Sequence, residues 1–345
     1  MKSTRKFLAA ALGLGLSATV VAACGGGGGS GADLTVYSGR TQNLVEPIIE
    51  RFEAETGLDV EVRYSTDSAT MALQIGEEGD RSPADVFVSQ SPGAMGYLDA
   101  ADRLLPIDEA ALEVVAERFR ADDGHWVGTS GRVRVLVYNT NAVTDAADLP
   151  TRITDLVAPT YAGEVGLAPE NPSFVDFITG MRELVGDAET RAFLDGLADN
   201  GARTYANNDA VLAAVARGEV DYGLVNHYYN ERAKLEDPEQ PTANHLFEAG
   251  DPGSMILTTT VGILDTGTDH LDAAQQFVAF LLGAEAQQYF AEETLEYPLR
   301  AGVAATIDDL PPLEEIAAPE LDLASLGDEF ADTRAMIADA GLAQA

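Results

Sequence analysis

Two adjacent tyrosines, Tyr228 and Tyr229, are the residues whose type and spacing most clearly suggest chemistry. They lie in the segment from Asp221 to Arg232, where an apolar run predicted to be a strand passes into a predicted helix. Open α/β sheets bind ligands at such strand ends. Two neighbouring phenol oxygens suit a hard, highly charged cation better than an organic substrate. The structural alternative is a pair of amphipathic aromatics, half-buried at the start of a helix.

Residue patterns typical of enzymes are missing. The four histidines, His227 among them, show no H-x-x-H or H-E-x-x-H spacing, so nothing indicates a sequence-local zinc site. His227 is predicted to be a solvated loop residue. The mature chain has no G-x-S-x-G elbow, Walker loop or strand-linked G-x-G-x-x-G. We therefore expect a binding protein, not an enzyme; a lipid-anchored hydrolase would need an activated nucleophile that the sequence does not offer.

The charge of the chain limits its partners. It carries 57 Asp and Glu against 21 Lys and Arg, a formal net charge of −36. Nucleic acid and anionic lipid surfaces both require a basic patch, so neither is expected as a partner. The apolar fraction of 46% is ordinary for a globular protein. The acidity indicates a solubility or salt adaptation of the surface and does not by itself predict a cation site.

The N-terminus reads as a targeting segment. Lys2, Arg5 and Lys6 precede an apolar stretch over residues 7–23 that is short for a membrane span. The stretch ends at Cys24, the only cysteine, in a sequence that resembles the lipobox of bacterial lipoproteins. We expect a signal peptide over 1–23, a Gly-rich tether over 24–32, and a lipid anchor on Cys24 that holds the protein to the outer face of the cell membrane.

Strands and helices alternate along the first part of the chain. Leu34–Ser38, Leu58–Tyr64 and Ala84–Ser89 are predicted strands, and helices are predicted over residues 44–56 and 69–78. Pro47 lies early in the first helix, and Gly57 is predicted to end it. This order indicates a parallel sheet covered by helices.

A second α/β unit is predicted in the middle of the chain. Its predicted strands are residues 133–139, 165–169 and 220–225, and its predicted helices are 173–184, 188–197 and 208–217. Residues 256–264, which follow this unit, are predicted to form a further strand. Residues 269–290 and the tail from Leu313 are predicted to be largely helical. The mature chain is long enough for two domains.

Six segments together identify a family resemblance. They are Leu34–Gly39, Arg81–Phe87, Ser130–Asn139, Asn226–Tyr229, Asp251–Gly253 and Glu296–Leu299. In this order and spacing they resemble the substrate-binding lipoproteins of bacterial ferric-iron ABC transporters, which have the type II periplasmic-binding-protein fold. The resemblance covers nearly all of residues 33–345.

The resemblance implies an α/β fold of two lobes, each a mostly parallel mixed sheet flanked by helices, with ligand in the cleft between them. Lobe 1 would hold residues 33–130 and 258–310, and lobe 2 would hold 131–257 and 311–345. Closure of such lobes would signal loading to the permease. The implied partners are a separate permease and ATPase, and the binding protein is expected to be a monomer outside the cytoplasm.

The resemblance also implies a site. Tyr228 and Tyr229 match the iron-binding tyrosines of the family. The positions that hold an accompanying anion in relatives match Arg132, Asn208, Asn226 and the loop from Asn171 to Ser173. This loop contains Pro172, which lacks a backbone N–H.

Three positions depart from the family pattern. A histidine ligand of some relatives corresponds to Thr41, a glutamate ligand corresponds to Gln90, and a third tyrosine corresponds to Phe174. Neither Thr41 nor Gln90 would bring negative charge to Fe³⁺.

The charge balance then predicts an anion. Ionising a phenol at pH 7 costs about 4 kcal/mol, because its pKa is about 10. Fe³⁺ would hold both tyrosines ionised, yet two tyrosinates leave one positive charge uncompensated. Carbonate, phosphate or a small iron chelate near Arg132 would supply the remainder. The alternative is an anionic organic solute, such as a phosphonate or sugar phosphate, bound by Arg132, Asn208 and Ser38 with neutral tyrosines.

Overall fold

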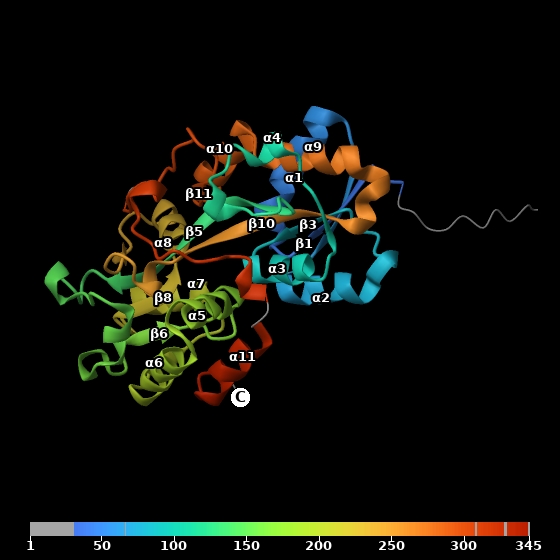
Figure 1. The fold of residues 1–345 in the computed structure, drawn as a ribbon. Coiled ribbons are helices and arrows are strands. Elements are labelled where there is room, and N and C mark those ends of the chain that lie inside the picture. Colours follow the sequence, from blue (N-terminus) through green and yellow to red (C-terminus); the bar gives the residue numbers. More distant parts are fainter. Residues whose placement is uncertain (1–30, 66, 308, 328–329, 344–345) are drawn as a thin grey trace, which may run out of the picture. The chain divides into compact units, whose positions relative to one another are not determined.

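The structure is a computed structural model that describes residues 31–65, 67–307, 309–327 and 330–343. The predicted signal peptide and Cys24 lie outside these residues. Among the residues described, no helix is both long and apolar enough to cross a bilayer. The predicted α/β class is confirmed, since helices pack against one mixed sheet whose strands follow the order β2-β1-β3-β10-β5-β8-β6-β7 (Figure 1).

The first elements alternate as the sequence predicts. They are β1 (Leu34–Ser38), α1 (Gln42–Thr56), β2 (Val60–Tyr64), α2 (Ser68–Glu78), β3 (Val86–Ser89) and α3 (Pro92–Ala100). Strand β1 pairs in parallel with both β2 and β3, so that Val36 lies between Val62 and Val86. The parallel arrangement brings the loops that follow β1 and β3 to the same edge of the sheet.

Helix α1 shows why this region folds as predicted. Val45, Ile48, Ile49 and Phe52 recur at helical spacing and are all buried. The helix ends at Gly57, whose φ of 74° lies in the left-handed region and whose N–H donates to the oxygen of Glu53. The sequence prediction for this helix is confirmed.

Two long antiparallel strands carry the chain from one set of strands to the other. They are β5 (Trp126–Asn139) and β10 (Ile256–Leu264). Residues 126–133 of β5 pair with β10, and residues 134–139 pair with β8 and β9. The sequence predicted only the second half of β5 as a strand, because glycine and polar residues at 128–132 lower the strand signal of the first half. These residues form a strand because pairing with β10 and β11 provides backbone hydrogen bonds and burial that their weak strand propensity does not predict.

The second set of strands surrounds β8. Its elements are β6 (Val165–Leu167), α5 (Pro172–Val185), α6 (Asp187–Asp199), β7 (Arg203–Thr204), α7 (Asn208–Ala216), β8 (Tyr222–Asn226), α8 (His227–Glu236) and β9 (Thr242–His245). Strand β8 pairs antiparallel with β5 and parallel with β6. Helix α7 packs on β8, and α5 packs on α6 (Figure 1).

The C-terminal region differs from the prediction. It contains α9 (Leu271–Leu281), α10 (Ala284–Glu292), β11 (Tyr297–Pro298) and α11 (Phe330–Asp339). Two short elements, β4 (Leu104–Leu105) and α4 (Glu109–Leu112), lie earlier in the chain, between α3 and β5. The helix predicted over 269–290 is broken at Gly283, whose backbone is extended. The tail prediction was wrong for most of residues 313–327, where only single 3₁₀ turns form, and Pro319 removes a helical donor there.

The lobe limits remain a prediction. Strands β5 and β10 pass through both predicted lobes. Helix α11 packs on α5, while the turn Ser325–Gly327 contacts both α3 and α5. The tail therefore touches helices assigned to each of the two predicted lobes.

Candidate functional site

The tyrosine pair lies at a strand–helix junction, as predicted. Tyr228 and Tyr229 are the second and third residues of α8, which begins directly after β8. Their rings stack with centroids 4.5 Å apart and an interplanar angle of 27°. Tyr228 is only 3% exposed, whereas Tyr229 is partly buried. Two phenol groups are thus held side by side by the backbone of a single helical turn.

Both tyrosines line a cleft of about 880 Å³. The cleft is bordered by the loops after β1 and β3, the N-terminal ends of α5 and α7, helix α8 and the end of α10. Its other lining residues are Thr41, Asn43, Leu44, Gln90, Glu170, Asn171, Pro172, Ala206, Asn207, Asp209, Leu212, Arg232, Ala233, Glu236 and Glu293. Segments more than 200 residues apart in sequence meet here, and the lining is mostly polar.

The structure brings some predicted site residues to the cleft and places others behind it. Thr41, Gln90 and Asn171 line the cleft together with the tyrosines. The other predicted residues are buried and do not line it: Ser38, Arg132, Ser173, Asn208 and Asn226. The Ser38 hydroxyl is used within its own turn, where it donates to the oxygen of Arg40 and accepts from its N–H.

The loop from Asn171 to Ser173 caps helix α5. Asn171 is the N-cap, and its Oδ1 accepts hydrogen bonds from the N–H and the hydroxyl of Ser173, at 3.1 and 2.8 Å. Asn208 donates to the Ser173 hydroxyl at 3.0 Å, while its own Oδ1 has no hydrogen-bond partner among the residues that the structure describes. Pro172 stands at the first helical position, where a missing N–H removes no intrahelical bond. The departure at Pro172 therefore costs little backbone hydrogen bonding.

Two arginines on β5 lie beneath the cleft. Arg132 donates to the hydroxyl of Thr259 at 2.7 Å and to the backbone oxygens of Gln90 and Thr258. Arg134 donates to the oxygen of Leu224 at 2.8 Å, and to the side chain of Asn226 at 3.4 Å. Both guanidinium groups are nearly fully buried.

Several buried N–H groups here have no acceptor. The Nε groups of Arg132 and Arg134 and the amide nitrogen of Asn226 make no hydrogen bond within the described part of the chain. Arg134 and Asn226 are direct partners in the β5–β8 register, and Arg132 is two residues away on the same strand. Buried donors without partners are uncommon, so these N–H groups are available to an acceptor that the protein itself does not supply.

Burial shifts the protonation equilibria of the site. It raises the pKa of Tyr228 well above 10, and the neighbouring Tyr229 adds to this effect. Burial also lowers the pKa of His227 to about 4 and that of Arg134 to about 9. Tyr228 is therefore a neutral phenol in this protein unless a cation displaces its proton.

His227 is not the solvated residue that the sequence suggested. It is fully buried; its Nδ1 accepts from the N–H of Val133 at 3.2 Å, and its Nε2 lies 3.0 Å from the oxygen of Leu295. These two partners require a neutral imidazole with the proton on Nε2. The residue joins α8 to β5 and does not offer a ligand nitrogen to the cleft.

Sequence reasoning missed Arg232, which lines the cleft. Its guanidinium lies 4.8 Å from the ring centre of Tyr228 and 5.2 Å from that of Tyr229. The signal was available, because residues three and four apart share a helix face. It also missed the buried pair Arg40 and Glu296, which are 256 residues apart and give no local signal.

The cleft offers hard oxygen donors. Besides the two phenols, its lining includes the carboxylates Glu170, Asp209, Glu236 and Glu293. Oxygen ligands of this kind suit hard cations, whereas soft thiolate ligands are lacking. Among the described residues, His and carboxylate side chains approach one another in a possible metal cluster only at Asp99, Asp123 and His125, which do not line this cleft.

Known proteins with similar sequences and structures share this architecture. The family profile described as bacterial extracellular solute-binding protein matches residues 81–322. The Fe(3+)-binding periplasmic protein of Serratia marcescens is 32% identical over 296 residues, 85% of this chain and 86% of the relative. Iron-bound HitA from Pseudomonas aeruginosa has a TM-score of 0.83 at 34% identity, covering 90% of this chain and 99% of that one. The Trichodesmium protein IdiA (FutA), solved with iron and citrate ligands, has a TM-score of 0.77 at 26% identity, covering 90% and 99%.

Proposed function

This chain belongs to the bacterial extracellular solute-binding proteins, and on that premise we propose that it captures ferric iron outside the cytoplasm and delivers it to the permease of an ABC importer. Its permease and ATPase would be separate chains. It would bind and release its cargo without catalysing a reaction. The names of its relatives favour iron over the anionic organic solute that the sequence left open as the alternative.

The stacked tyrosine pair is the observation that carries the proposal. Two phenol oxygens on one helical turn line a polar cleft, and one of the phenols is nearly fully buried. Ionising such a phenol at pH 7 costs more than the roughly 4 kcal/mol of a free one, because burial raises its pKa further. A trivalent cation that binds both oxygens is a ligand strong enough to displace both protons. In this proposal Tyr228 and Tyr229 are the iron ligands.

An anion completes the proposed site. Thr41 and Gln90 line the cleft but carry no charge, so two tyrosinates would leave one positive charge of Fe³⁺ to be compensated by an anion or by a carboxylate of the cleft lining. Arg132, Arg134 and Asn226, which are buried and do not line the cleft, each have an N–H group without an acceptor in the described part of the chain. These donors support the proposal that carbonate, phosphate or the anionic part of a small chelate is bound. Asn171, Ser173 and Asn208 would border it. The related protein solved with iron and citrate makes a carboxylate chelate a concrete candidate.

We further propose that the protein acts as a lipid-anchored monomer. The basic N-terminal residues, the apolar stretch and the lipobox-like sequence before Cys24 support this. These residues lie outside those that the structure describes. Labelling of growing cells with a radioactive fatty acid would test the anchor, because Cys24→Ser should abolish incorporation of label.

Iron binding is tested directly by elemental analysis and visible absorption. Protein purified without chelators and loaded with ferric citrate should hold iron and show a tyrosinate-to-iron charge-transfer band. Tyr228→Phe and Tyr229→Phe should each remove most of that band. Tyr138→Phe is the matched control, because Tyr138 lies on β5 and does not line the cleft. Intact protein that takes up no iron and shows no band would refute the proposed function.

A further inference from the structure

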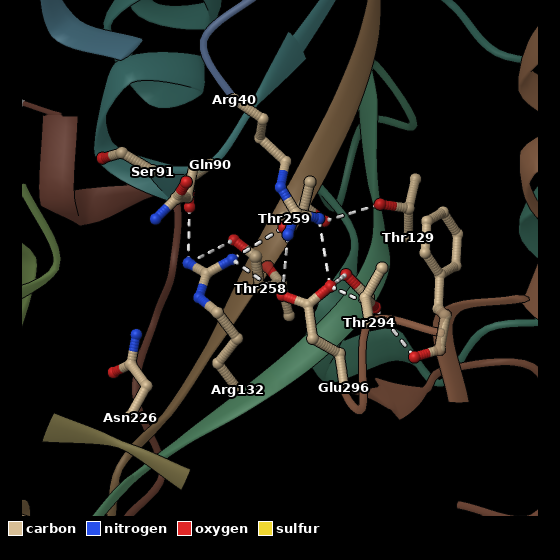
Figure 2. Close-up of polar contacts among 12 residues, drawn as sticks. Arg40, Gln90, Ser91, Thr129, Arg132, Asn226, Thr258, Thr259, Thr294 and Glu296 are labelled. Carbon is tan, nitrogen blue, oxygen red and sulfur yellow. Dashed lines mark hydrogen bonds and ion pairs between the residues drawn. The ribbon is translucent and has the colours of Figure 1, made fainter. Parts of the chain in front are cut away.

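A buried ionic network lies behind the cleft and is distinct from its lining. The Glu296 carboxylate forms a two-pronged pair with Arg40, at 3.0 and 3.1 Å, and also accepts from the hydroxyls of Ser130 at 3.0 Å and Thr294 at 3.1 Å (Figure 2). Its Oε1 lies 4.0 Å from a guanidinium nitrogen of Arg132. We call Arg40, Glu296 and Arg132 the buried network.

The buried network carries a net charge of +1, because it contains two arginines and one glutamate. Two guanidinium groups and one carboxylate are each at most 2% exposed. The opposite charges and hydrogen bonds around Glu296 lower its pKa in spite of burial, so it stays ionised. Without this carboxylate, two like charges would remain buried without compensation, which is strongly unfavourable. Glu296 therefore limits the positive charge behind the tyrosines to that of one arginine of the network.

The network also reaches the cleft wall. Arg132 donates to the backbone oxygen of Gln90, and the Gln90 N–H donates to the hydroxyl of Ser68 at 2.9 Å. The Ser68 hydroxyl donates in turn to the oxygen of Gly39 at 3.0 Å. Gly39 directly precedes Arg40, which is followed by the cleft residue Thr41.

The contact at Gly39 shows how closely these segments are joined. A Cβ atom at Gly39 would lie 2.2 Å from the Ser68 hydroxyl and 2.7 Å from its Cα. The loops after β1 and β3 are thus held together by Ser68 on one side and by the buried network on the other. Both loops contribute lining residues to the cleft, whereas Glu296 itself does not.

We infer that Glu296 is a positioning residue for ferric-iron binding: through Arg40 and Arg132 it fixes the cleft segments that carry Thr41 and Gln90, and it sets the charge that the bound ion and its anion experience. This inference rests on the proposed function. When residues that orient metal ligands without contacting the ion are altered, metal affinity usually changes by about 10–100-fold. We expect a change in iron affinity of this size when Glu296 is altered, although its side chain does not contact the ion.

The variant Glu296→Gln keeps the shape of the side chain and removes its charge. We expect ferric affinity, measured with ferric nitrilotriacetate, to fall by about tenfold or more because the cleft wall is loosened. The affinity of the iron-loaded variant for inorganic phosphate should rise, because the charge behind the site becomes more positive. A residue with a purely structural role would not strengthen phosphate binding. Glu285→Gln, an exposed change on α10, is the control and should alter neither affinity.

A second variant guards against loss of folding. Arg40→Gln combined with Glu296→Gln removes both charges of the pair and leaves the net charge of the network unchanged. It should fold, bind iron weakly, and bind phosphate as the unaltered protein does. Folded variants with unchanged iron and phosphate affinities would overturn the inference. So would a parallel loss of both affinities, or failure of both variants to fold, since either result would assign Glu296 to stability alone. If the unaltered protein takes up no iron, the proposed function itself fails.

Discussion

The pH dependence of stability should change when Asp176 is replaced by asparagine. Asp176 lies on α5, is 2% exposed, and accepts a hydrogen bond from the Ser91 hydroxyl at 2.6 Å. Ser91 is the N-cap of α3, so this bond joins two helices 85 residues apart in sequence. Asparagine has the same shape and keeps an oxygen that can accept this bond, so the variant removes the titration and little else.

The magnitude follows from the pKa of Asp176. Burial raises it from 3.8 to about 7, against opposing effects of the Ser91 hydrogen bond and the charge of Arg132; Asp67 raises it further and Arg334 lowers it. The folded protein therefore binds this proton more tightly than the unfolded chain does. The resulting stability is present below pH 4 and is lost as the pH rises through 7. Over the whole pH range, the contribution of Asp176 to the free energy of unfolding changes by about 4 kcal/mol, and about 2.5 kcal/mol of this is lost between pH 5 and pH 8.

Urea unfolding at pH 5 and pH 8 measures this effect. The free energy of unfolding of Asp176→Asn, relative to that of the unaltered protein, should be about 2.5 kcal/mol higher at pH 8 than at pH 5, so the variant is relatively more stable at pH 8. Other titrating groups cancel in this difference. Ser91→Ala is a useful companion, because it removes the hydrogen bond and should leave the pH dependence of Asp176 in place. An equal stability difference at the two pH values would show that Asp176 is ionised in the folded protein and would refute the reasoning.

Three further results are expected. Burial lowers the pKa of His227 to about 4, so the pH dependence of its contribution to stability is opposite to that of Asp176. This contribution is present above pH 6.5, and about 2 kcal/mol of it is lost as the pH falls from 8 to 5. In urea titrations, His227→Gln should therefore lose less stability between pH 8 and pH 5 than the unaltered protein does. Gly39→Ala should destabilise the protein by about 1–3 kcal/mol in thermal unfolding, because its Cβ would overlap Ser68; an unchanged melting temperature would contradict the close contact. Ferric iron at a hundredfold excess over its dissociation constant should stabilise the protein by about 2.7 kcal/mol, and the melting temperature of Tyr228→Phe should respond far less; equal responses would argue against Tyr228 as a ligand.

Local patterns determined much of the fold. Alternation of period two and helical spacing predicted α1, β1 to β3 and most of the elements around β8, because each such segment has one apolar face that any packed arrangement must bury. The same reasoning located Tyr228 and Tyr229 at the junction of β8 and α8. It could also have found Arg232, which shares a helix face with them.

Elements with weak local signals were missed or misjudged. The first half of β5 is a strand only because β10 and β11 pair with it, and residues 313–327 form only single 3₁₀ turns where the sequence predicted helix. In both cases partners distant in the sequence supply hydrogen bonds and burial that local propensity does not encode.

The sequence by itself determined which phenols stand side by side, since neighbouring residues of a helical turn are held together by the backbone. Only the tertiary structure decided what surrounds them. Glu296 meets Arg40 across 256 residues, and His227 is buried where its sequence neighbours suggested solvent. A charged or polar side chain carries no periodic signal of its own burial, because that depends on whether a partner arrives from elsewhere in the chain to offset the cost of removing it from water.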